Sequence, residues 1–79
     1  MLLAAVAART RRVVLFPDVA NLPLRPPAMM AKAAGSLDLL SGGRFELGLG
    51  AGGFWDAIKA MGGPARTPAE SVSALEEAI

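Results

Sequence analysis

The sequence contains no cysteine, no histidine and no tyrosine. Without cysteine there is no disulfide to stabilise a small fold and no thiol chemistry, and without histidine or cysteine a zinc site is excluded. The commonest general base and the commonest nucleophilic thiol of enzymes are therefore missing as well. An excess of one charge is also absent, because 8 Lys and Arg against 7 Asp and Glu leave a net charge of +1. No global field draws this chain to nucleic acid or to an acidic membrane.

Long apolar runs and targeting features are absent too. The apolar start at Met1–Ala8 has no basic region before it, meets Arg9 at once and is too short to span a membrane. We therefore expect a cytoplasmic protein with no membrane partner. Arg9, Arg11 and Arg12 have no aromatic neighbours and suit a helix C-terminus better than a nucleic-acid patch, so we expect no nucleic-acid partner.

What the chain does have is apolar surface: 53% of its 79 residues are hydrophobic. A domain of this size buries only ~60–65% of the surface that its unfolded chain exposes. Because neither a disulfide nor a zinc site can stabilise it, burial against other copies is the remaining way to cover that surface. We therefore expect an oligomer or a piece of something larger.

The first half of the chain predicts a helix, a strand and a second helix. Residues 2–10 are rich in Leu, Val and Ala and suit the last turns of a helix. The unbroken apolar run Val13–Phe16 predicts a strand buried on both faces, as in a parallel sheet. After a Pro-rich loop, a helix is expected from Pro27 to Leu40, ended by the glycines that follow Ser41. Its residues near one packing stripe are Met29, Met30, Ala33, Leu37 and Leu40.

The second half predicts a strand at Phe45–Leu49, a glycine-rich loop and a short helix at Phe54–Met61. A capping box, Thr67 with Glu70 three residues later and Pro68 between them, begins a last amphipathic helix. The order is helix, strand, helix, strand, helix, helix. This order predicts an α/β fold with two parallel strands.

The segment Gly48–Gly53 fits the pattern G-x-G-x-x-G. Dinucleotide binding would also need an acidic residue that ends a further strand about 20 residues later. Glu70 has that spacing but lies in the capping box, so the dinucleotide interpretation is weak. A glycine loop at the carboxyl end of a parallel strand is nevertheless where α/β folds bind ligands.

Few side chains near this loop carry chemistry. Trp55 could stack on a ring, but a partly buried anchor for the short helix is the simpler interpretation. Asp18 is the one carboxylate placed like a site residue, at the end of the first strand. The carboxylates of Asp38 and Glu46 are expected to pair with Lys32 and Arg44. We assign no catalytic residue and see no metal-binding cluster.

Several segments together resemble one known family. They are Asn21–Arg25, Pro27-Ala28, Ala31-Lys32, Leu37-Asp38, Leu40–Phe45 (Leu-Ser-Gly-Gly-Arg-Phe) and Leu47–Gly52. The chain is similar to the luciferase-like monooxygenases, the flavin- or deazaflavin-dependent oxidoreductases that include bacterial luciferase. The match covers nearly the whole chain but about a quarter of a typical family member.

The resemblance implies a partial TIM-type (β/α) barrel, in which residues 1–79 form a single truncated luciferase-like α/β unit. Val13–Val19 and Phe45–Leu49 would be the third and fourth barrel strands, with a non-proline cis peptide bond at Asp18–Val19. If a cofactor binds, it would be FMN or a deazaflavin. The residues expected to contact it are Asp18, Val19, Ala51, Gly52 and Gly53.

Two positions depart from the family pattern. Phe16-Pro17-Asp18 replaces a small Gly-Thr-Gly type segment, and Gly53 stands where some deazaflavin enzymes have an acidic residue. The resemblance implies an oxidoreductase or monooxygenase whose activity in this chain alone is weak or absent. The alternative is a non-catalytic, self-associating protein, a homodimer through the helices at 2–10 and 27–40.

Overall fold

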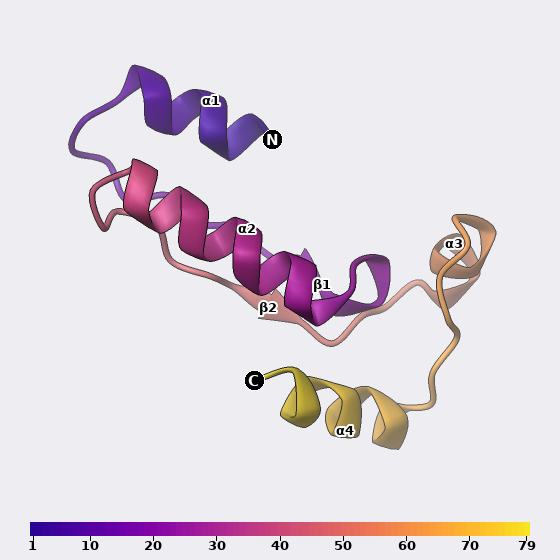
Figure 1. The fold of residues 1–79 in the computed structure, drawn as a ribbon. Coiled ribbons are helices and arrows are strands. Elements are labelled where there is room, and N and C mark those ends of the chain that lie inside the picture. Colours follow the sequence, from indigo (N-terminus) through magenta and orange to yellow (C-terminus); the bar gives the residue numbers. More distant parts are fainter.

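The computed structural model describes all residues from 1 to 79 and confirms the expected order of elements. Two short strands are joined by a long helix, and further helices stand at both ends of the chain (Figure 1). The elements are α1 (Leu2–Arg9), β1 (Ala20–Asn21), the 3₁₀ turn η1 (Leu22–Leu24), α2 (Pro27–Leu40), β2 (Leu49–Gly50), α3 (Trp55–Ala60) and α4 (Pro68–Ala78). The chain is therefore a small α/β unit.

The two strands pair in parallel, as predicted, with Ala20 beside Leu49 and Asn21 beside Gly50. An isolated parallel bridge between Leu15 and Phe45 aligns the same two segments nearer their start. The predicted strand bounds are wrong, since β1 follows the predicted segment Val13–Val19 and β2 shares only Leu49 with Phe45–Leu49. Pro17 lies between the bridge and β1 and has no N–H to donate, which interrupts a ladder at that point.

The expectation that Val13–Phe16 is buried on both faces is wrong. Leu15 is 4% exposed, but Val13, Val14 and Phe16 are each at least 50% exposed. Only 8 of the 79 residues are buried, since two short strands and their helices offer few neighbouring side chains. The apolar run favours an extended segment; how many layers cover that segment depends on the rest of the fold.

Helix α2 begins and ends where its sequence signals lie. Pro27 is its first residue, and Gly42 follows the last turn with φ +69°. The Gly42 N–H donates to the Leu39 carbonyl (3.2 Å) and the Gly43 N–H to the Asp38 carbonyl (2.8 Å), which together form a Schellman motif. In the predicted stripe Met30 is buried, but Met29 is 66% exposed, because neighbouring residues lie about 100° apart around a helix.

Helix α4 has the predicted capping box. The Glu70 N–H donates to the Thr67 hydroxyl (3.2 Å), and the Thr67 N–H donates to the Glu70 carboxylate (3.4 Å). Its apolar side chains have little to pack against, with Val72 56% exposed and Ile79 88% exposed. Across the whole chain, no helix combines the length and the apolar character that crossing a membrane requires.

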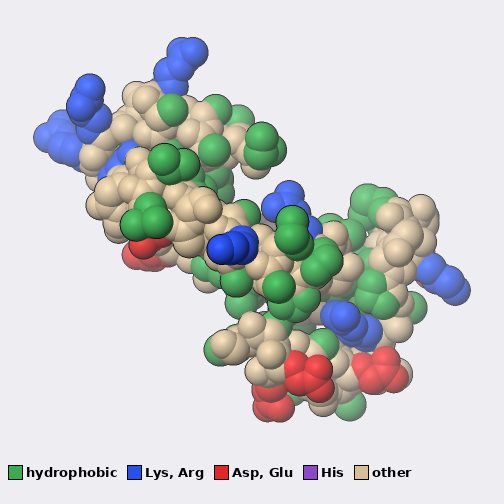
Figure 2. All heavy atoms as spheres, in the orientation of Figure 1, with side chains coloured by type: hydrophobic (Ala, Val, Ile, Leu, Met, Phe, Trp, Pro, Cys, Tyr) green, Lys and Arg blue, Asp and Glu red, His purple; other side chains and the backbone are tan.

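The molecule is elongated, with principal extents of 40 × 23 × 17 Å. Helices α1 and α2 lie side by side, and α3 and α4 stand towards the other end (Figure 1). Figure 2 shows basic side chains around the end that holds α1, acidic side chains over α4, and apolar side chains on the open surface between them. The fold thus leaves apolar and charged surface uncovered around one small sheet.

Candidate functional site

The carboxyl ends of the two parallel segments meet at a close backbone contact. A Cβ atom added at Gly48 would lie 2.5 Å from the Pro17 carbonyl oxygen, and one added at Gly50 would lie 2.5 Å from a Val19 methyl carbon. Real Cβ atoms do not approach that closely, so Gly48 needs glycine against the backbone carbonyl, and a Cβ at Gly50 would have to displace the Val19 side chain. The Ala20 N–H completes the contact by donating to the Gly48 carbonyl (2.8 Å).

The bend before β1 lies directly against this contact. The Asp18–Val19 peptide bond is cis, as the family resemblance implies. The Asp18 side chain is exposed and Val19 is 47% exposed, so both side chains are open to solvent beside β2. Of the predicted site residues, Val19 therefore lies against Gly48 and Gly50, whereas Asp18 is exposed to solvent.

The loop Ala51–Gly53 continues from β2 and is half-buried throughout. Gly52 has φ +113°, and a Cβ there would lie 2.7 Å from the Trp55 ring and 2.8 Å from Pro23. Trp55 is half-buried and starts α3, which confirms its interpretation as a partly buried anchor. Gly53, by contrast, has no atom within 4 Å of the position of a Cβ. The space beside the Cα atom of Gly53 is therefore open.

Phe54 has an unusual geometry that the sequence analysis did not identify. Its φ of 54° and ψ of 53° place it in the left-handed region, and its side chain is 93% exposed. Its carbonyl accepts hydrogen bonds from the N–H groups of Ala57 (3.0 Å) and Ile58 (3.2 Å), so it caps α3 rather than lying within the helix. Glycine is the usual residue at such a φ, and no local pattern predicts phenylalanine there.

Arg44 does not form the ion pair with a carboxylate that the sequence suggested. All five of its guanidinium N–H groups donate to other oxygens. The acceptors are the carbonyl oxygens of Ser41 (2.7 Å), Val13 (3.1 Å), Ala7 (3.0 Å) and Thr10 (3.2 Å) and the hydroxyl of Thr10 (3.0 Å). The expected pairing with Asp38 or Glu46 is wrong, because carbonyls at the ends of α1 and α2, together with the Thr10 hydroxyl and the Val13 carbonyl, take every donor. Arg44 thus joins the two helix ends to the strand segment.

Two hollows are formed between the elements. A groove of about 740 Å³ separates α1 from the sheet and α2 and is mostly apolar. We call it the α1–α2 groove; it is lined by Met1–Ala4, Pro17, Val19–Asn21, Leu24, Arg25, Met30, Ala33, Ala34, Ser36, Leu37, Leu40, Phe45 and Leu47.

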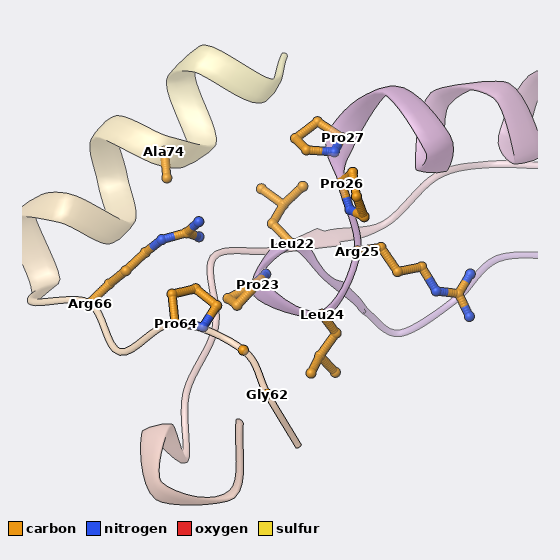
Figure 3. Close-up of a pocket in the computed structure, with 11 residues that line it drawn as sticks. Leu22, Pro23, Leu24, Arg25, Pro26, Pro27, Gly62, Pro64, Arg66 and Ala74 are labelled. Atoms are coloured by element: carbon orange, nitrogen blue, oxygen red, sulfur yellow. The ribbon is translucent and has the colours of Figure 1, made fainter. Parts of the chain in front are cut away.

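A smaller pocket of about 270 Å³ lies between the turn η1 and α4 (Figure 3). Its two basic side chains, Arg25 and Arg66, point in different directions, with Arg66 extending between α4 and Leu22. The charges therefore do not converge on one anion.

The interpretation of Gly48–Gly53 as a dinucleotide fingerprint fails in the structure. No strand follows β2, and Glu70 is held in the capping box of α4. The geometry instead has a glycine loop at the carboxyl ends of paired parallel strands. This arrangement defines an α/β unit with a glycine loop at its strand ends, which is the position where enzymes of this fold class bind ligands.

The chain belongs to the luciferase-like monooxygenase family, whose family model matches residues 1–79. It is 40% identical over 77 residues to the 4-hydroxyprotoasukamycin monooxygenase of Streptomyces nodosus subsp. asukaensis, covering 96% of this chain and 21% of that protein. It is 44% identical over 64 residues to an uncharacterised protein of Mycobacterium tuberculosis (strain ATCC 25618 / H37Rv), covering 81% and 22%. It is 46% identical over 48 residues to the pyrimidine monooxygenase RutA of Stutzerimonas stutzeri (strain A1501), covering 61% and 13%. The chain thus spans about a fifth of the length of the first two relatives.

Proposed function

We propose that this chain is the part of a flavin- or deazaflavin-dependent monooxygenase that contacts one side of the cofactor ring. In this proposal the segments ending in β1 and β2 are two neighbouring strands of a TIM-type (β/α) barrel. The observation that carries it is the contact of the two strand ends. Because Gly48 and Gly50 have no Cβ atom, the chain around Val19 can bend directly against them. Ligands of such barrels bind at this end of the strands.

The residues at the strand ends fit a flat aromatic ring. Gly53 leaves its backbone open, and Val19 offers a half-exposed apolar side chain from the neighbouring segment. Ala51 and Gly52 support the loop between them, and Asp18 precedes Val19 at the bend. When bound, FMN or a deazaflavin would supply the hydride- or oxygen-transfer chemistry. The protein would bind and orient the ring through these five positions, Asp18, Val19, Ala51, Gly52 and Gly53.

The departure at Phe16-Pro17-Asp18 is compatible with this geometry. Phe16 is 56% exposed, so its bulk is not inserted between the two strand ends. The Pro17 carbonyl packs against Gly48 instead, and the bend forms despite the larger residues.

The chain has two strands, whereas a closed TIM-type barrel has eight strands. Two strands can therefore contact only one part of a cofactor ring. We therefore expect weak or absent monooxygenase activity from these 79 residues alone, in a protein of the cytoplasm.

Trp55 is the single tryptophan and lies against Gly52, so its fluorescence reports on the proposed site. Titration of the 79-residue chain with FMN, and separately with a reduced deazaflavin, should quench this fluorescence saturably at micromolar concentration. The variant Gly53→Ala should raise the dissociation constant about tenfold, because its methyl group occupies the open approach to the backbone.

Gly35→Ala is the matched control, since a Cβ at Gly35 also meets nothing within 4 Å but lies in α2. It should leave the quenching curve unchanged. Non-saturable quenching, or an equal effect of both substitutions, would count against the proposal.

A second candidate function, self-association without catalysis, is favoured by the surface of α1 and α2. Leu2 is 78% exposed on α1, and Met29 and Leu39 are 66% and 84% exposed on α2. Exposed apolar surface of this kind marks association surfaces. In this proposal two copies form a homodimer through the helices at 2–10 and 27–40.

Light scattering at micromolar concentration tests the homodimer. We expect a dimer, and we expect Leu39→Lys in α2 to shift it to monomer. Val72→Lys is the control, because Val72 is 56% exposed but lies on α4. A folded monomer of the unmodified chain would contradict the homodimer proposal.

A further inference from the structure

The geometry of Phe54 points to an aromatic contact that the family comparison does not assign. We propose that the Phe54 side chain contacts the face of the planar ring bound at the strand ends. This inference rests on the proposed function and adds to it a side chain that has no packing role within the chain.

Phe54 combines two unfavourable features. Its backbone lies at φ 54° and ψ 53°, a region that a bulky side chain with a Cβ rarely adopts. Its ring is 93% exposed, so burial of the ring within the chain does not offset the strain. Strained residues of this kind cluster at active sites and ligand clamps, where the strain is part of the function.

Phe54 lies next to the loop that the proposed ring would contact. Phe54 directly follows Gly53, whose backbone is open, in the loop that leaves β2. The left-handed backbone turns the chain sharply between this open loop and α3, whose first turn it caps. An apolar aromatic side chain beside an open glycine backbone suits a flat aromatic heterocycle, since stacked or edge-to-face aromatic pairs are favourable beyond the area that they bury.

The variant Phe54→Gly distinguishes a purely structural role of Phe54 from a role in ligand contact. Glycine adopts this backbone region without strain and is accepted at an N-cap, so the variant should fold more favourably, with the unfolding equilibrium constant about fivefold lower. Loss of the ring should raise the dissociation constant for riboflavin about tenfold. Phe54→Tyr keeps an aromatic ring and should bind riboflavin as the unmodified chain does.

The test is a riboflavin titration followed by Trp55 fluorescence, together with urea denaturation, on the unmodified chain, Phe54→Gly and Phe54→Tyr. Riboflavin is the probe because it carries the ring without the phosphate. Higher stability with weaker binding in Phe54→Gly, and normal binding in Phe54→Tyr, support the proposal. Equal binding by Phe54→Gly and the unmodified chain overturns the proposal while leaving the proposed function intact. Absence of binding to the unmodified chain overturns both.

Discussion

At the residue scale, single atoms decide where the chain bends and which segments touch. Gly48 admits the Pro17 carbonyl and Gly50 admits Val19, so the contact between the strand ends depends on two missing Cβ atoms. Arg44 acts at the opposite end of the unit, where its guanidinium group connects residues more than thirty positions apart in sequence. The first effect positions the proposed site, and the second holds α1 to the sheet.

Gly48→Ala should destabilise the chain, because its Cβ would meet a backbone carbonyl that cannot rotate away. A cost of about 1–3 kcal/mol is typical of forcing an extra methyl group into a filled space. Gly35→Ala should have the opposite sign, about 0.5–1 kcal/mol more stable, since Gly35 lies inside α2 with open space around it. Urea denaturation followed by circular dichroism measures both, and equal effects would contradict the close contact.

Arg44→Ala should cost about 2–3 kcal/mol, because it leaves the carbonyls at the end of α1 without their charged donor. Arg44→Lys should recover only part of this loss, since an ammonium group cannot match the planar fork of donors. Amide hydrogen exchange should show α1 losing protection first. Arg12→Ala is the control, because Arg12 is exposed, and its exchange pattern should match that of the unmodified chain.

At the element scale, local signals predicted helix ends well and strand burial poorly. Thr67 and Glu70 lie within one turn, and Gly42 and Gly43 act on carbonyls of the turn before them, so their hydrogen bonds need only local sequence. The burial of Val13 and Phe16 and the partners of Arg44 depend on residues far away in sequence, which no local pattern contains. In the proposed site the glycine loop was predictable, whereas the strained backbone of Phe54 was not.

Thr67→Ala should shorten α4 from its start. It removes the hydroxyl that accepts from the Glu70 N–H, a loss of about 1 kcal/mol at an N-cap. Because α4 packs loosely, we expect a measurable drop in helical circular dichroism rather than global unfolding. Thr67→Ser keeps the hydroxyl and should retain the signal; if both variants lose it equally, the capping box is not the cause.

At the scale of the whole molecule, the chain has more apolar surface than it can cover. Only 8 of 79 residues are buried, so most apolar side chains have few neighbours within the chain. The proposed function connects these observations, because in that proposal the strands and helices are part of a barrel that holds a cofactor at its strand ends. In this proposal the rest of the barrel covers the open apolar surface, and the cofactor covers the open glycine loop.

Ligand binding should therefore stabilise the molecule measurably. FMN at 100 times its dissociation constant should add about 2.7 kcal/mol to the free energy of unfolding, if it binds the folded chain alone. Thermal unfolding with and without FMN measures this gain. No shift of the midpoint at saturating FMN would show that the ring does not bind the folded state.

The most direct test of the cofactor site is the map of backbone amide NMR shifts as FMN is added to the 79-residue chain. Binding at the strand ends predicts that the largest saturable shifts fall at Val19, Ala51, Gly52 and Gly53, while amides around the Arg44 hydrogen bonds stay unchanged. Shifts gathered instead at the amides of α1 and α2 that line the α1–α2 groove, such as Ala4, Ala33 and Leu37, or no saturable shift at any amide, would contradict the account.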